Sequence, residues 1–437
     1  MILRAALTAA LLLLPALARA EIDITEVKSP GGLTAWLVED HDIPFTALEI
    51  RFRGGTSLDD PAKRGAIYLM AGLIEEGAGD LDSRGFAEAR DALAAHFSFG
   101  ASADGFSVSA RFLTENRDQA VDLLALALNQ PRFDEDAVAR VREQVLSGLR
   151  SDEKDPAVLA SRAFDAMAYG EHPYASAGRG SIDTVQALTR ADMVVAHKAA
   201  LARDRVYISA AGDITAEELG LMMDRLLGAL PETGAPQPGR APWLLKPGVT
   251  VIDFPSPQSL VTFGHEGIAQ DDPDFFAAYI LNEVMGGGRF SARLMNEVRD
   301  KRGLTYGIGS YLIGMDHSES VMGQFSASND KVAEAIAVIR AEWQKIAAEG
   351  IAEKELAETK TYLTGAYPLR FDGNAPIASI LVGMQMQGMP IDYPNTRNAR
   401  IEAVTMDDVK RVAARLFRPE ALHFVVVGRP EGVTSEP

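Results

Sequence analysis

Residues 54–77 read GGTSLDDPAKRGAIYLMAGLIEEG: a Gly-Gly loop leads through two aspartates and a proline into an apolar helix. Asp59, Asp60 and Pro61 are typical of a helix start, because a carboxylate accepts hydrogen bonds from free backbone N–H groups and proline needs no such partner. We therefore predict a helix over 58–76. Its apolar part contains no histidine and no carboxylate, so it presents no strong ligand for a metal ion.

The composition is that of a large soluble protein without thiols. The chain has 437 residues, more than one ordinary hydrophobic core holds, so we expect two or more domains. Hydrophobic residues make up 47% and charged residues 24%, which are ordinary values for a globular protein. Cysteine is absent, which excludes thiol nucleophiles and cysteine-bound zinc and leaves stability to core packing.

The first twenty residues are typical of a secretory signal peptide. Arg4 precedes an apolar run over 5–16, and Ala-Arg-Ala at 18–20 offers the small residues of a cleavage site. The run is shorter than the roughly 20 apolar residues of a membrane-spanning helix. We therefore expect residues 1–20 to be removed before Glu21, leaving a periplasmic or secreted chain with no membrane span.

The chain is strongly acidic, with a formal net charge of −18. Without the two arginines of the signal peptide, 41 basic residues stand against 61 acidic ones, a net charge of −20. Such a surface repels phosphate backbones, so nucleic acid is excluded as a partner.

A linker divides the mature chain into two similar parts. Residues 229–247 contain five prolines and two glycines, a composition typical of a connecting segment. We therefore predict one domain over 21–228, a second over 248–430, and a tail over 431–437.

Two patterns recur in both parts at nearly equal offsets, which indicates a duplication. One is a helix that begins Thr-x-x-Asp, followed by a β-rich run that ends at glycine; the other is an amphipathic helix with an acidic start. The recurring segments are 189–212 and 405–428, at an offset of 216 residues, and 133–148 and 351–366, at an offset of 218.

Strand and helix patterns alternate in the first part. We expect a hairpin of strands over 32–38 and 46–53 joined by a turn at 39–43, and two further strands within 97–113. We also expect a helix over 83–96 capped by Ser83. The remaining predicted helices are 117–128 and 135–150. These patterns predict an α+β fold of two homologous domains, each a mainly antiparallel sheet with helices packed on one face.

Three segments together resemble the insulinase-like zinc peptidases, the M16 family. They are WLVEDHDIPFTALEIRFRGGTSLDDPAKRGAIYLMAGLIEEGA at 36–78, HPYASAGRGSIDTVQALTRADMVVAHKAALARDRVYISAAGDI at 172–214, and MGGGRFSARLMNEVRDKRGLTYGIGSYL at 285–312. The resemblance covers nearly the whole mature chain in the family's order. It implies the metallohydrolase fold shared by LuxS and the mitochondrial processing peptidases.

The resemblance also implies a zinc site that this chain has lost. In the family, His-x-x-Glu-His on one helix supplies two zinc ligands and the base that acts on zinc-bound water, and a distal glutamate is the third ligand. The matching positions here are Tyr68, Ala71, Gly72 and Gly148. None of these residues is a good zinc ligand or takes up a proton at neutral pH. We therefore expect neither metal nor another cofactor in this chain.

No other pattern in the sequence replaces this site. The histidines, none of which lies three or four residues from another, are at 41, 96, 172, 197, 265, 317 and 423. Asp316 and His317 precede Ser318, but a turn between strands explains this run better than a catalytic triad does. The nucleophile elbow Gly-x-Ser-x-Gly of serine hydrolases is absent.

Polar residues survive in the second half. Arg299 and Tyr306 match an arginine and a tyrosine that, in the family, face the zinc site across a closed chamber, hold the substrate backbone and stabilise the oxyanion. The alternative is that Arg299 pairs with Glu297 or Asp300 and that Tyr306 is an ordinary strand residue.

A glycine-rich loop is also retained, formed by Gly286, Gly287 and Gly288. In similar non-catalytic subunits of mitochondrial processing peptidases, a loop at this place is implicated in substrate handling. A simple helix end followed by a turn is the alternative.

We therefore interpret the chain as the non-catalytic subunit of a heterodimeric, periplasmic M16-type zinc peptidase. A partner with an intact His-x-x-Glu-His would bring zinc, and this chain would close the peptide chamber and supply Arg299 and Tyr306 in trans. Its substrates would be peptides or unfolded polypeptide. The alternative is a peptide-binding or assembly protein on the same fold, with no hydrolytic role.

Overall fold

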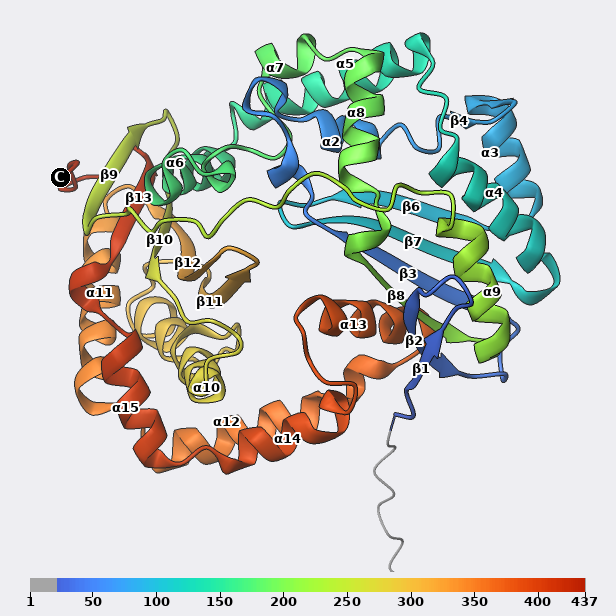
Figure 1. The fold of residues 1–437 in the computed structure, drawn as a ribbon. Coiled ribbons are helices and arrows are strands. Elements are labelled where there is room, and N and C mark those ends of the chain that lie inside the picture. Colours follow the sequence, from blue (N-terminus) through green and yellow to red (C-terminus); the bar gives the residue numbers. More distant parts are fainter. Residues whose placement is uncertain (1–21, 437) are drawn as a thin grey trace, which may run out of the picture.

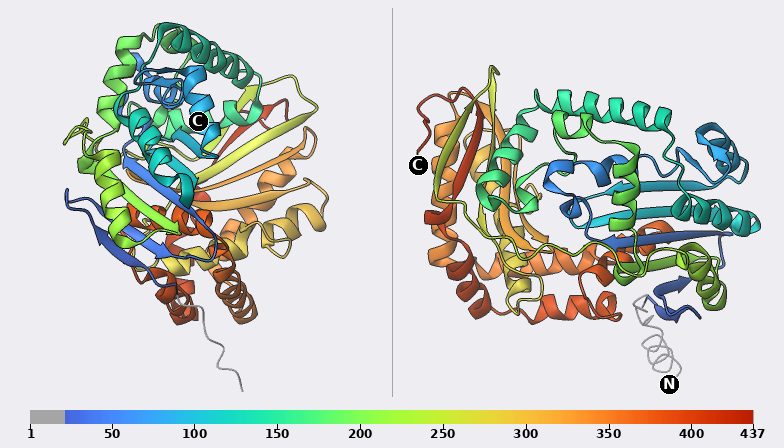
Figure 2. Two further views of the ribbon diagram at one scale, coloured as in Figure 1. Left: turned by 90° about the vertical axis from the view of Figure 1, so that its right-hand side faces the viewer. Right: turned by 45° about the horizontal axis from the view of Figure 1, so that its top comes forward.

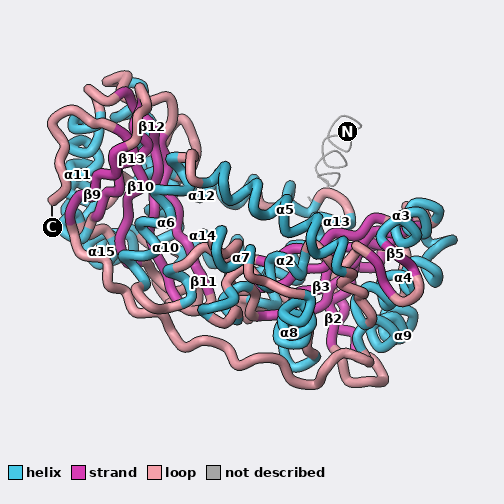
Figure 3. Tube along the Cα trace, turned by 90° about the horizontal axis from the view of Figure 1, so that it is seen from above, coloured by secondary structure: helices cyan, strands magenta, loops and turns pink. Residues whose placement is uncertain are grey.

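The computed structural model describes residues 22–436, so the predicted signal peptide at 1–20 lies outside the described residues. Two large β-sheets lie at opposite ends of the molecule, each with helices packed on it (Figures 1, 2 and 3). Among the described residues, no helix is both long enough and apolar enough to cross a membrane.

The first sheet has six strands in the order β1-β2-β8-β3-β7-β6. Only β2 and β8 run parallel; the other neighbours are antiparallel. The strands are β1 (Thr25–Lys28), β2 (Thr34–Glu39), β8 (Val206–Gly212), β3 (Phe45–Arg53), β7 (Gly105–Leu113) and β6 (His96–Ala101).

The predicted hairpin of 32–38 and 46–53 is wrong. β2 and β3 do run in opposite directions, but β8 lies between them and bonds to both. Neighbouring strands are about 4.8 Å apart, so a five-residue connection easily spans the width of one extra strand. β8 is buried over most of its length, and its insertion gives the sheet an apolar central strand.

The second sheet repeats the first. Its order is β11-β12-β10-β13-β9, and read from β9 this matches β2-β8-β3-β7-β6 in both order and strand direction. The single parallel pair, β9 with β13, corresponds to β2 with β8. The strands are β11 (Ile308–Met315), β12 (Ser318–Ser328), β10 (Gln258–Glu266), β13 (His423–Gly428) and β9 (Gly248–Asp253). The predicted α+β fold of two homologous domains is confirmed.

The helices at the start of the repeated segments 189–212 and 405–428 also begin alike. The hydroxyls of Thr189 and Thr405 each accept a hydrogen bond from a backbone N–H three residues later. The carboxylate of the aspartate at that position accepts one from the backbone N–H of the threonine. In the first half the helices are α2 (Ala66–Ala71), α3 (Ser83–Ala92), α4 (Arg117–Asn129), α5 (Glu135–Asp152), α7 (Ile182–Gln186), α8 (Arg190–Ala200) and α9 (Ala216–Leu227). In the second half they are α10 (Phe275–Gly286), α11 (Val332–Glu349), α12 (Glu353–Ala366), α14 (Tyr393–Ala403) and α15 (Met406–Leu416).

Two predicted helix starts differ in the structure. The helix expected over 58–76 is α-helical only in α2, because the buried Asp59 carboxylate accepts from the N–H groups of Gly65 (2.9 Å) and Ile67 (3.0 Å) and fixes the start there. Burial raises the pKa of Asp59 to about 6. The α3 cap is the Asp82 carboxylate rather than Ser83, whose hydroxyl donates to Glu76 at 2.5 Å.

Each half lends one helix to the sheet of the other half. α6 (Pro156–Tyr169) packs on β10 and β13 through Phe164, and α13 (Asn374–Met386) packs on β2 through Leu381 and on β3 and β8 through Ala378. Pro156 and Asn374 are 218 residues apart, the same offset as the second sequence repeat. The exchanged helices cover the sheet faces that each half's own helices leave open (Figure 1).

Polar contacts near the β11–β12 turn also join the two halves. The N–H of Asp316 donates to the Asp104 carboxylate (3.1 Å), and the N–H of His317 donates to the hydroxyl of Tyr174 (3.2 Å). The carboxylate of Asp316 pairs with Arg53 at 2.9 Å. This run is therefore a turn between strands, as expected, and it docks on the first half.

A buried histidine makes folding of the second half sensitive to acid. His265 on β10 accepts a hydrogen bond from the Trp343 indole (3.1 Å), and its Nδ1 donates to the Glu266 carbonyl (2.8 Å). Burial lowers the pKa of His265 to about 4 from 6.5. Because the unfolded chain binds this proton first, the stability from His265 is complete above pH 6.5 and is lost as the pH falls toward 4.

We expect the stability advantage of the wild type over a His265→Gln variant to shrink by about 2 kcal/mol between pH 7 and pH 5. Urea unfolding of both proteins at both pH values measures this difference. The comparison with the variant removes the opposite contributions of Asp59 and Asp165, whose pKa values burial raises to about 6. An advantage that does not change with pH would contradict the prediction.

Candidate functional site

The positions that correspond to the lost zinc site lie on α2 and α5. Tyr68 and Ala71 are on α2, Gly72 ends that helix, and Gly148 is in the last part of α5. Ala71 is buried, Tyr68 is half-buried, and a Cβ added to Gly72 would meet Val141 at 3.2 Å. The structure therefore brings these positions onto two neighbouring helices.

An arginine fills the space between them. The guanidinium of Arg179 lies 5.3 Å from the centre of the Tyr68 ring, and its Nη2 occupies the place that a Cβ on Gly148 would take. Its Nη1 pairs with Asp152 at 3.1 Å, and Asp152 also pairs with Arg162 at 3.0 Å. A positive charge thus lies against two of the four degenerate positions, Tyr68 and Gly148.

The residues present do not fit zinc. Neither an imidazole nor a carboxylate occupies any of the four positions. Across residues 22–436, no three histidine, aspartate or glutamate side chains gather in a way that could hold a metal ion.

The structure brings Arg299 and Tyr306 together in one groove of about 530 Å³. Arg299 lies on a π-helix (Met295–Asp300), and Tyr306 lies just before β11 with 90% of its surface exposed. π-helical turns are frequent at functional sites. The groove is also lined by Gln258, Gly303, Thr305, Ser326, Ser328 and Lys331.

The guanidinium of Arg299 has two neighbours. It pairs with the Asp300 carboxylate at 2.8 Å, which is one of the two ion pairs predicted from the sequence as the alternative to a catalytic role. It also lies 5.0 Å from the centre of the Phe290 ring. Glu297, the other acid considered, pairs instead with Lys301 and Arg302. A surface ion pair contributes only about 0–1 kcal/mol, so a stronger carbonyl or oxyanion partner can replace Asp300.

The three glycines next to this groove do different things. Gly286 ends α10 against β11, where a Cβ would stand 2.6 Å from the backbone nitrogen of Ser310. Gly287 is the C-cap residue that follows α10, and Gly288 has a φ of +76°, which favours glycine. This turn carries Phe290, 69% exposed, over Arg299. The loop therefore combines a helix end with the placement of an aromatic side chain at the groove.

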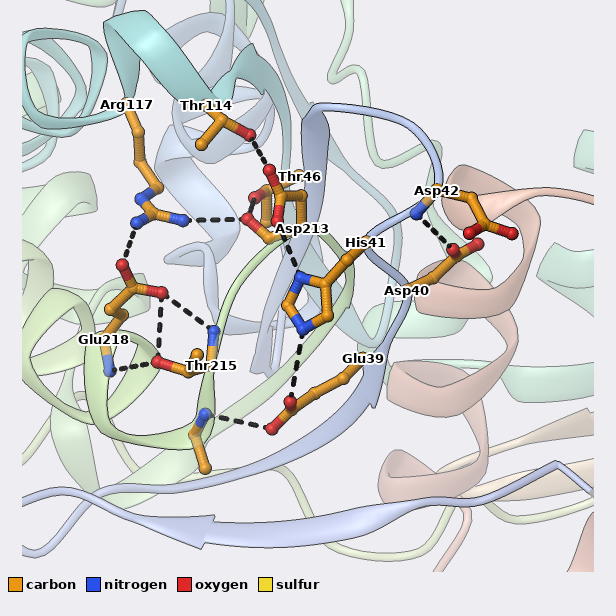
Figure 4. A network of polar contacts seen from close by, with 11 residues as sticks. Glu39, Asp40, His41, Asp42, Thr46, Thr114, Arg117, Asp213, Thr215 and Glu218 are labelled. Carbon is orange, nitrogen blue, oxygen red and sulfur yellow. Dashed lines mark hydrogen bonds and ion pairs between the residues drawn. The ribbon is translucent and has the colours of Figure 1, made fainter.

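A second polar cluster contains a histidine and hydroxyl groups but lacks the geometry of a catalytic triad (Figure 4). His41 Nδ1 bonds Asp213 at 2.6 Å, which raises the pKa of His41. The hydroxyl of Thr114 donates to the same carboxylate at 2.5 Å rather than to the imidazole, so no base activates it. Arg117 donates to the Asp213 carbonyl and pairs with Glu218. The cluster ties the loop after β2 to the start of α9.

Asp316, His317 and Ser318 do not form a triad either. Asp316 pairs with Arg53, and the His317 ring packs against Tyr174 with centroids 5.8 Å apart. The Ser318 hydroxyl faces Tyr169 at 3.5 Å.

Family models match most of the chain. Residues 35–179 match the insulinase family, peptidase family M16, and residues 187–363 match the peptidase M16 inactive domain. The chain belongs to the peptidase M16 family. This M16 chain is 24% identical to the non-peptidase homolog YmxG of Helicobacter pylori, over 85% of this chain and 86% of that protein. It is 25% identical to an uncharacterized zinc protease of Streptomyces coelicolor, over 88% of this chain and 85% of the relative.

Solved structures show the same fold. The peptidase M16 inactive domain from Pseudomonas fluorescens superposes with a TM-score of 0.86 at 28% identity, covering 95% of this chain and all of that one. A protease from Helicobacter pylori superposes with a TM-score of 0.84 at 17% identity, over 93% of this chain and 99% of that one.

Sequence reasoning missed Arg179 and Phe290. Arg179 stands between Gly178 and Gly180 in a loop more than a hundred residues after Tyr68, and a lone arginine between glycines was its only signal. Phe290 was visible as an apolar residue directly after the glycines and Arg289, in a stretch that the structure leaves exposed.

Proposed function

We propose that this M16 chain is the non-catalytic subunit of a two-chain, M16-type zinc peptidase of the periplasm. One observation carries the proposal: the two halves are unequally preserved. The first half has no ligand at its four zinc positions, whereas the second half presents Arg299 and Tyr306 in one exposed groove. The similarity to both a non-peptidase homolog and proteins described as zinc proteases supports this division of labour.

In the proposed enzyme, the partner subunit binds zinc through His-x-x-Glu-His and activates the water. This chain closes the peptide chamber and presents Arg299 and Tyr306 to the scissile carbonyl. A guanidinium and a phenol both donate hydrogen bonds, and such donors stabilise the negative charge that develops on the oxygen in the transition state. Peptides and unfolded segments are the substrates that such a chamber admits.

Zinc content provides the direct test. We expect this chain alone to purify without stoichiometric zinc and without peptidase activity, and the complex with a zinc-binding M16 chain to hold one zinc per heterodimer and to cleave peptides. Elemental analysis and a fluorogenic peptide assay measure both properties. A partner whose motif glutamate is changed to glutamine is the control, because it should assemble and bind zinc without cleaving. Zinc bound one-to-one by this chain alone would refute the proposal.

The ion pair of Arg299 with Asp300 favours a second candidate, a peptide-binding or assembly protein with no hydrolytic role. In that case the partner would cleave peptides equally well with and without this chain, and the complex would still form.

A further inference from the structure

We propose that Arg179 is a built-in cation that replaces the metal of the first half and excludes zinc from it. This inference does not depend on a partner subunit, because it concerns only contacts within this chain. It assigns a role to a charged side chain that lies against both degenerate positions Tyr68 and Gly148.

The backbone around Arg179 is fixed against the segment that precedes α2. A Cβ on Gly178 would overlap the side chain of Thr56, and a Cβ on Gly180 would overlap the carbonyl of Arg64. Gly180 has a φ of +80°, a conformation that glycine adopts readily. The hydroxyl of Thr184 donates to the Arg64 carbonyl at 2.9 Å. Arg179 is therefore held in place by the same loop that leads into α2.

The side chain is fixed at its charged end. Nη1 reaches both Asp152 oxygens, at 3.3 and 3.1 Å, and the guanidinium carbon lies over the Tyr68 ring. Cation–π contact and an ion pair with a mostly buried carboxylate act on the same group. Nη2 is aimed at Gly148, where only a hydrogen leaves it room.

This arrangement opposes a metal in two ways. A divalent cation next to the partly exposed guanidinium meets like-charge repulsion. A carboxylate introduced at position 148 would meet Arg179 first and would form an ion pair instead of binding a metal. Restoring the family's ligands therefore does not by itself restore the zinc site.

The test compares two restored chains. One carries Tyr68→His, Ala71→Glu, Gly72→His and Gly148→Glu; the other carries these four changes and Arg179→Ala. Zinc binding is measured by native mass spectrometry and by competition with a chelating dye, and circular dichroism checks that both chains fold. We expect the chain with five changes to bind one zinc ion about 10-fold to 100-fold more tightly than the chain with four. Equal affinities, or no zinc in either chain, would overturn the proposal.

A second variant tests Arg179 in the natural background, where folding is not in question. Arg179→Met keeps the apolar stem and removes the charge, so Asp152 keeps only Arg162 as a partner. We expect the melting temperature to fall by about 2–4 °C. Arg150→Met, which removes an exposed arginine 3.9 Å from Glu143 on α5, should leave it unchanged. Identical melting of the wild type and Arg179→Met would show that the guanidinium does not hold the site together.

Discussion

Residues 22–240, produced without the rest of the chain, are expected to aggregate or to remain partly folded, although they include every strand of the first sheet. The reason is α13, which comes from the second half and covers one face of that sheet. Trp36 on β2 is buried against Leu381 and Met384 of α13, and Ala47 and Ala211 are buried against the same helix.

The free energy contributed by the contact between α13 and the first sheet decides whether residues 22–240 fold alone. Burying one large apolar side chain contributes about 1.5–3 kcal/mol. Trp36, Leu381 and Met384 with their partly buried neighbours therefore contribute about as much as the 5–15 kcal/mol that stabilises an ordinary domain. The second half is in the same position, because α6 from the first half covers Val425 and Val427 of β13.

Co-expression separates this explanation from a simple folding defect. Residues 22–240 and 241–437 produced together should form a soluble complex, whereas each piece alone should appear in the insoluble fraction. In the intact chain, Leu381→Asp should lower the free energy of unfolding by several kcal/mol, and Leu221→Asp, at a position 59% exposed on α9, should change it little. A monomeric 22–240 fragment that unfolds cooperatively would contradict the prediction.

The helix exchange also shows what sequence reasoning can reach. Helix starts such as Thr189 and Thr405 and strand ends such as Gly212 and Gly428 depend on residues close together in the chain, so the duplication was visible. The prediction of a hairpin of β2 and β3 was wrong because β8, more than 150 residues later in the chain, inserts between them. The residues of β2 and β3 do not indicate that a distant strand pairs with both. In the same way, the apolar face of a helix does not say which sheet it covers.

In the candidate site, too, the residues in local motifs were predicted and the residue brought in by tertiary structure was not. Tyr68, Ala71, Gly72 and Gly148 were found by matching a motif within short segments. Arg179 was not, because its contact with two of these positions depends on a loop that tertiary structure folds back onto α2 and α5.

Two substitutions in the second half are expected to remove most activity of a reconstituted peptidase. If Arg299 and Tyr306 stabilise the oxyanion in trans, Arg299→Ala and Tyr306→Phe should each lower kcat by about 100-fold to 1,000-fold, as loss of an oxyanion donor does elsewhere. Because the hydrogen bonds strengthen in the transition state, KM should change less than kcat. Initial-rate assays over a range of peptide concentrations measure both constants.

A matched control lies three residues away. Arg302, exposed to the same degree as Arg299, pairs with Glu297 and does not line the groove, so Arg302→Ala should retain activity. Asp300→Asn removes the carboxylate that pairs with Arg299 and should retain or raise activity, because the guanidinium then meets the substrate without a competitor. If Arg299→Ala and Tyr306→Phe left turnover intact in a complex that still held one zinc, the groove would not be part of the catalytic machinery. The chain would then act through binding or assembly, since its remaining contribution would be the surface that it presents to a partner.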